Sequence, residues 1–303
     1  MVTLYENATH LLMTAKPEQL DKLSEAFEFQ PDGYFYAPSY ERWRASGGRE
    51  GWDGYLRPLQ RLTATSGRIL RGYKSAVIEE IEERGYKYSA QKLLPLPFAG
   101  LTWQDVPPDC VKADFLLDDH QRTGIAAWLG SGIGVNQVTV AGGKTVMFAA
   151  AAALIKQKYA KARFLYLTPS ERLVRQVTRE MKRFLPHWDI GQFGGGVRQM
   201  KAKDMVVCTV AMLSKHFITL KAHKWLSSFM AVLYDECHHC GSASSKKVLL
   251  EVPAYFRLGA SDSVKEDDAT RSRDILVSMI TRSTPPHPPH RLSIWAMAAC
   301  PAM

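Results

Sequence analysis

The chain has 303 residues, of which 46% are hydrophobic, and a formal net charge of +9. It is long enough to bury a sizeable core in two folded units, and its basic balance suits a polyanionic partner. Its five scattered cysteines argue against a disulfide framework, and its start lacks a signal-peptide pattern. The most apolar run, residues 146–155, is half the roughly twenty residues that a membrane span needs. We therefore expect a cytoplasmic protein.

The amino-terminal third predicts a small α+β module that ends near residue 105. Residues 19–27 form one amphipathic helix candidate, with Pro17 near its start. Residues 74–84 form a second, with its apolar residues on one face and Gly85 as its stop. A Pro-rich joint follows at residues 94–97 and 107–108.

Trp52-Asp53-Gly54 lies between these two helices and admits two interpretations. In the first, the tripeptide simply forms a turn, for which these residue types are typical. Trp52 or the nearby Arg57 could equally contact nucleic acid.

Strand and helix signals alternate in the middle of the chain. This alternation predicts a mainly parallel sheet with helices on both faces and ligands at the carboxyl ends of its strands. The expected strands are residues 135–140, 163–167, 205–209 and 231–234, and the expected helices are residues 146–156 and 171–184.

Gly142-Gly143-Lys144-Thr145 follows the first of these strands and precedes its helix, the order of a phosphate-binding loop. Backbone N–H groups and the helix N-terminus would surround the phosphates of ATP. Lys144 would reach the terminal phosphates, and Thr145 would be a ligand of Mg²⁺. The loop departs from the usual patterns, because Val138 and Ala141 stand where glycine is expected.

Asp235-Glu236 ends the apolar strand 230–234 and completes the predicted ATP site. Asp235 would hold Mg²⁺, and Glu236 would activate the attacking water. A zinc site at Cys237-His238-His239-Cys240 is an alternative, but the other three cysteines are isolated and give no second ligand pair.

Further motifs occur around this pair in the order found in superfamily 2 DNA helicases, which the chain resembles. The resemblance implies that Gln121 contacts adenine, and that His238, Ala260 and Ser261 couple hydrolysis to movement. Gly259-Ala260-Ser261 matches the usual Ser-Ala-Thr only in part. The DNA-binding candidates that it implies are Thr168, Pro169, Ser170, Gly194, Gly195 and Thr209.

The resemblance also implies an architecture and a function. Residues 106–275 are expected to form the first RecA-like ATP-binding domain. Residues 1–105 resemble the small domain of the phage UvsW- and XPB-type group, which assists recognition of branched DNA. The expected function is an ATP-dependent DNA helicase or translocase of a bacterial or phage-infected cell. A non-catalytic DNA-binding remnant and half of a restriction-system translocase stay open as alternatives.

The carboxyl-terminal tail departs from the family. Residues 276–303 show no clear period and contain the run Thr284-Pro285-Pro286-His287-Pro288-Pro289. A second RecA-like domain is not visible. We expect a truncated or frame-shifted form with an irregular tail, in which the second domain could be supplied in trans; a genuine short variant is the alternative.

Overall fold

The computed structural model describes residues 1–30, 33–139, 141–222, 224–237 and 243–262. These residues divide into two compact units at Leu94 and Pro95. The division falls inside the predicted Pro-rich joint. Residues 95–105 belong to the second unit, where Phe98 and Leu101 pack against its core. The predicted tail, residues 276–303, lies outside the described residues.

The first unit is built on a five-stranded sheet of order β3-β4-β2-β1-β5. Its neighbours are antiparallel except for β1 and β5, which run parallel. The strands are β1 (Val2–Glu6), β2 (His10–Thr14), β3 (Gln60–Thr63), β4 (Ser66–Leu70) and β5 (Tyr88–Lys92).

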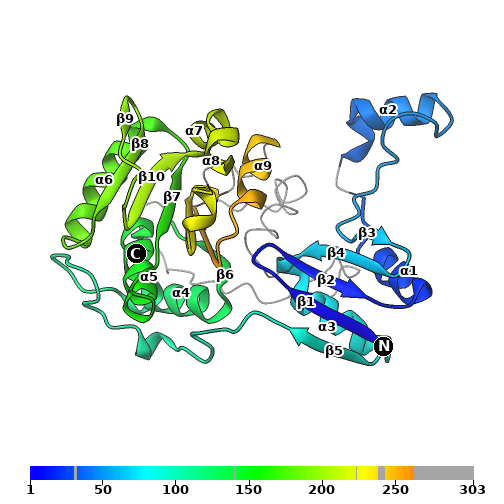
Figure 1. Ribbon diagram of the computed structural model, residues 1–303, viewed down its shortest axis with the longest axis horizontal. Helices are drawn as coiled ribbons and strands as arrows, with labels where there is room; N and C mark the ends of the chain where they lie inside the picture. Colours follow the sequence, from blue (N-terminus) through cyan, green and yellow to red (C-terminus); the bar gives the residue numbers. More distant parts are fainter. Residues whose placement is uncertain (31–32, 140, 223, 238–242, 263–303) are drawn as a thin grey trace. The chain divides into compact units, whose positions relative to one another are not determined.

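Helices α1 (Pro17–Ala26) and α3 (Lys74–Glu83) contribute to the core of the first unit, together with Phe27, Leu59 and Tyr73 from the connections. Pro17 occupies the first turn of α1, and α3 buries Val77 and Ile81 as the sequence predicts. Between α1 and β3 the chain makes an excursion that carries η1 (Tyr34–Tyr36) and α2 (Pro38–Ala45), drawn away from the sheet in Figure 1. The short η2 (Arg71–Tyr73) leads into α3.

The second unit contains a seven-stranded sheet of order β6-β12-β11-β7-β10-β8-β9. All neighbouring strands are parallel except β8 and β9. The strands are β6 (Ile133–Gln137), β7 (Phe164–Thr168), β8 (Ile190–Gly194), β9 (Val197–Arg198), β10 (Met205–Thr209), β11 (Ala231–Asp235) and β12 (Phe256–Ser261). This RecA-like α/β architecture is the fold that the sequence predicts.

Helices cover both faces of this sheet (Figure 1). One layer is α4 (Asp119–Ser131), α5 (Lys144–Lys158) and α6 (Glu171–Phe184). The other is α7 (Val210–Lys215), α8 (Phe217–Ala222) and α9 (Ala243–Glu251). The short helices η3 (Trp103–Asp105) and η4 (Leu226–Ser228) lie in connections.

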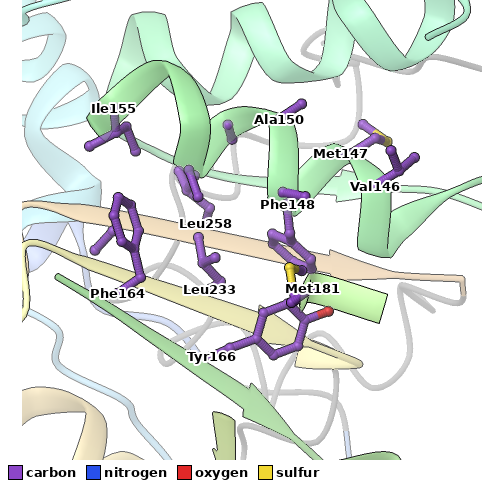
Figure 2. Packing of buried hydrophobic residues seen from close by; sticks show 14 of the residues in the cluster. Val146, Met147, Phe148, Ala150, Ile155, Phe164, Tyr166, Met181, Leu233 and Leu258 are labelled. Carbon is purple, nitrogen blue, oxygen red and sulfur yellow. The ribbon is translucent and has the colours of Figure 1, made fainter. Parts of the chain in front are cut away.

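The main core lies between the sheet and the layer of α4, α5 and α6. Helix α5 is its centre, because the helix carries apolar residues on all of its faces and its middle is almost wholly buried. Figure 2 shows Phe148 of α5 above Leu233 of β11 and Tyr166 of β7. In the described part of the chain, no helix is both long and apolar enough to cross a membrane.

Candidate nucleotide site and nucleic-acid edge

The predicted phosphate loop lies at the carboxyl end of β6 and leads into α5. The strand ends at Gln137, earlier than predicted, because the chain then turns to form the loop. Gly143 caps the 15-residue helix with φ +85°. Ala141 also adopts a left-handed backbone, with φ +64°. Glycine takes this conformation without strain, whereas the alanine at this position does so at a cost.

The loop packs tightly on the beginning of α4. A Cβ atom on Gly143 would lie 2.3 Å from Nε2 of Gln121, so a larger residue does not fit there without movement. Gln121 is buried; its Nε2 donates to the Gly142 carbonyl at 3.2 Å, and its Oε1 accepts from the Asp118 N–H at 3.1 Å. The predicted adenine-contacting residue therefore braces the loop in this structure.

Lys144 and Glu236 form an ion pair, although they lie 92 residues apart in the sequence. Both side chains are largely buried, at 14% and 23% exposure. Glu236 has φ +51°, an uncommon backbone conformation for a residue other than glycine. Strained backbone of this kind clusters at functional sites, where the surrounding fold holds it.

Asp235 lies at the end of β11, beside the loop. Its side chain is buried, and its backbone pairs with Ala260 of β12, which in turn pairs with Asn136 of β6. Burial, and to a lesser extent the nearby Glu236 carboxylate, raise the pKa of the Asp235 carboxyl to about 6, with Lys144 opposing the change. In the metal-free protein, the ionised form of Asp235 is therefore costly.

This raised pKa predicts a pH dependence of both stability and metal binding. The folded protein binds the Asp235 proton more tightly than the unfolded chain does. This binding contributes fully to stability below pH 3.8, the pKa in the unfolded chain, and the contribution is lost as pH rises through about 6. At pH 8 without metal, Asp235→Asn should raise the free energy of unfolding by about 1–3 kcal/mol, and the gain should vanish near pH 4. Since a metal needs the ionised carboxylate, Mg²⁺ affinity should fall about tenfold per pH unit below pH 6. Thermal unfolding in EDTA at several pH values measures the first effect; a gain independent of pH would contradict it.

The arrangement suits a nucleotide with Mg²⁺. The N-terminus of α5 offers backbone N–H groups and a positive dipole end. Thr145 lies in the first turn of that helix, and a buried carboxylate, Asp235, lies at the end of β11, two strands from β6 in the sheet. Hydroxyl and carboxylate oxygens are the ligands that Mg²⁺ prefers.

The predicted DNA-contacting segments meet at one edge of the sheet. Thr168 ends β7 and pairs in register with Thr209, which ends β10. On the other side of β10, Cys208 pairs with Phe193, and Gly194 follows at the end of β8. Three segments from separate parts of the sequence therefore lie side by side at the carboxyl edge of the sheet.

The side chains at this edge differ in exposure and in hydrogen bonding. Thr168 is fully buried, and its hydroxyl donates to the Ser170 carbonyl at 3.1 Å. Ser170 and Thr209 accept from backbone N–H groups of α6 and α7 and cap these helices. Pro169, Ser170 and Gly195 are exposed, so a ligand can reach the tips of the loops.

The predicted coupling segment is a buried strand between the two nucleotide motifs. Ala260 and Ser261 of β12 are fully buried, and Ala260 is the direct neighbour of Asp235. His238 lies outside the described residues, as does most of the Cys-His-His-Cys alternative. Among the described residues, no group of three or more His, Cys, Asp or Glu side chains could hold a metal ion.

Two buried polar residues of this unit escaped the sequence analysis. Arg257 of β12 donates to the carbonyls of Val252 at 2.7 Å and Leu249 at 2.6 Å, and so anchors the end of α9. Tyr166 places a hydroxyl inside the main core. Each is a residue with a polar group in an otherwise apolar strand. This pattern indicates that the residue is buried, but it does not indicate which group the residue contacts.

Three comparisons place this geometry among known proteins. Residues 115–262 match the family model described as "Type III restriction enzyme, res subunit". The crystal structure of the UvsW helicase from bacteriophage T4 superposes with a TM-score of 0.72 at 18% identity, covering 92% of this chain and 98% of that one. A second T4 UvsW structure gives 0.70 at 17% identity, covering 92% of this chain and 56% of that one. A comparison with curated proteins found no match.

The fold and the family match support an ATP-hydrolysing motor domain of the helicase type. The family match covers residues 115–262, just under half of the chain. At these identities, the likeness to UvsW shows the fold alone, and it extends over the first unit as well as the second.

Proposed function

We propose that this chain is the motor part of an ATP-dependent DNA helicase or translocase, in which DNA stimulates ATP hydrolysis. The observation that carries the proposal is the contact of Lys144 with Glu236. The contact joins a phosphate-binding loop and an acidic strand end that the sequence separates widely. Phosphoryl transfer to water uses a lysine that binds the phosphates and a residue that positions the attacking water, and this contact brings candidates for both together.

In this proposal, Lys144 exchanges the Glu236 carboxylate for the terminal phosphate when ATP binds. Glu236 would then orient the attacking water and accept its proton. Thr145 and Asp235 would hold Mg²⁺, which when bound neutralises charge on the phosphates. Gln121, Gly142 and Gly143 would fix the loop around the nucleotide, since their contacts already hold it. Ala260, next to Asp235, would transmit the change along β12.

DNA would bind at the loop tips beyond β7, β10 and β8. Pro169, Ser170 and Gly195 are exposed there, and Thr168, Thr209 and Gly194 shape the loops beneath them. Backbone N–H groups at the starts of α6 and α7 suit phosphate contacts that carry no sequence preference. The net charge of +9 favours such binding.

We further propose that the first unit recognises branched DNA. The excursion that carries α2 supports this proposal, because it exposes Phe35 and Tyr36 next to the exposed Arg42 and Arg44. Aromatic rings with arginine form stacking platforms for unpaired bases. The Trp52–Arg57 segment has a local role: Trp52 donates to the Tyr55 carbonyl at 2.7 Å, and Arg57 pairs with carboxylates of its own unit.

A second RecA-like domain supplied in trans would complete the motor. The described residues hold one sheet of this type, and family motors close two such domains on the phosphates. Turnover per chain that rises with protein concentration would support completion by a second copy. Such a motor would work in the cytoplasm of a bacterial or phage-infected cell.

The test is ATP hydrolysis by the purified chain without DNA, with single-stranded DNA and with branched DNA. We expect turnover that DNA stimulates and that Lys144→Ala abolishes. Binding of DNA without hydrolysis would instead identify a non-catalytic DNA-binding protein. The description of the matched family favours half of a restriction-system translocase as a second candidate. Equal stimulation by branched and long linear duplex DNA would favour that candidate.

A further inference from the structure

Tyr166 lies beneath the proposed nucleotide site in a fixed orientation. Its side chain is fully buried, and its ring meets the Phe148 ring edge-on at 5.3 Å. Phe148 in turn stacks on Trp128 of α4 at 4.8 Å with the rings 10° from parallel. This row of rings leaves the phenol little freedom to turn.

The sheet register points the hydroxyl of Tyr166 toward the site. Tyr166 pairs with Leu233 of β11, and Asp235 follows two residues later on the same face. Phe148, which packs on Tyr166, follows Thr145 by three residues, so both lie on one face of α5. In Figure 2 the oxygen of Tyr166 points toward the end of α5 where Val146 and Met147 lie, and away from Ile155.

The surroundings of the hydroxyl are polar groups of that site. Burial raises the pKa of Tyr166 well above its usual value; the nearby Asp235 carboxylate raises it further, and the Thr145 hydroxyl lowers it. Despite this proximity, the Tyr166 hydroxyl has no partner of good hydrogen-bond geometry among the described residues. An unsatisfied buried hydroxyl is costly, so a state of the site that satisfies it is favoured.

We propose that Tyr166 is a positioning residue of the nucleotide site, whose hydroxyl donates a hydrogen bond to Oγ1 of Thr145 in the Mg²⁺-bound state. This inference rests on the proposed function. A threonine hydroxyl has one proton and two lone pairs. With one lone pair held by Tyr166, the other faces the metal, and the proton is free to point toward Asp235. Tyr166 would thus orient a metal ligand from inside the core.

The test is the Mg²⁺ dependence of nucleotide binding by the full chain, measured with a fluorescent ATP analogue in EDTA and across a Mg²⁺ titration. Tyr166→Phe removes one oxygen atom and keeps the packed ring. We expect the Mg²⁺ midpoint to rise about 5- to 20-fold, as for the loss of one hydrogen bond, with affinity in EDTA unchanged. In a Thr145→Ala background, the same substitution should have no further effect on the midpoint.

Tyr255→Phe is the matched control, because Tyr255 lies just before β12, at the opposite end of the same sheet. It should leave the Mg²⁺ midpoint unchanged. An unchanged midpoint in Tyr166→Phe, or additive effects of Tyr166→Phe and Thr145→Ala, would overturn the inference while the proposed function stands. A parent chain that shows no Mg²⁺-dependent nucleotide binding would overturn both.

Discussion

Replacing Glu236 with Gln is expected to reduce DNA-stimulated ATP hydrolysis about 10²- to 10⁴-fold, the usual contribution of a general base. The amide keeps the size of the side chain but cannot accept a proton from water. ATP should still bind, because Lys144 and the loop are intact. Steady-state hydrolysis at saturating ATP measures the loss.

The same substitution should tighten nucleotide binding. In the structure, the Glu236 carboxylate occupies Lys144, so ATP must displace it. Removing this competitor, a largely buried ion pair with a net contribution of about 1 kcal/mol, should increase ATP affinity about fivefold.

Asp204→Asn is the matched control for both effects. Asp204 also pairs with a lysine of α5, Lys156 at 2.6 Å, but near the opposite end of that helix. Its substitution should leave hydrolysis and ATP affinity nearly unchanged. Hydrolysis by Glu236→Gln within about threefold of the parent chain would remove Glu236 from the role of general base.

Replacing Glu6 with Gln is expected to destabilise the first unit by about 3–5 kcal/mol. The Glu6 carboxylate accepts from Arg71 at 2.7 Å, from Lys74 at 2.7 Å and from the Leu94 N–H at 3.0 Å. The Glu6 and Arg71 side chains are each 2% exposed. The substitution removes the negative charge that Glu6 supplies to the buried Arg71 guanidinium.

Hydrogen exchange of the full chain, followed by mass spectrometry, can measure this effect in the first unit alone. Amides of β1, β2 and α3 should exchange faster, while those of the second unit keep their protection. Glu28→Gln is the control, because its pair with Arg57 is 27% and 45% exposed and should contribute at most about 1 kcal/mol. Equal effects of the two substitutions would contradict the assignment of Glu6 as a central buried ion.

The sequence by itself determined the parts whose signals are local. Helix α6 and strand β10 have the predicted bounds, because α6 carries a strong helical period and a serine cap, and β10 is a short apolar run before a threonine cap. The loop and Asp235-Glu236 were recognisable because each is a short motif at a strand end. Strands β1 and β2 escaped notice, since the buried Glu6 and the apolar run Leu11-Leu12-Met13 hide their alternation in the sequence.

The tertiary structure decided which residues face one another. The strand order β6-β12-β11 places Asp235, at the end of β11, near the loop that follows β6. No local sequence pattern encodes this order. The partners of Glu6 lie as far as 88 residues away, and Lys144 lies 92 residues from Glu236. The packing of Tyr166 against Phe148 of α5 likewise depends on strand register and helix packing. Hydrophobic periodicity shows that a residue is buried, but only the packed sheet shows against what, because the pairing is a long-range property of the chain.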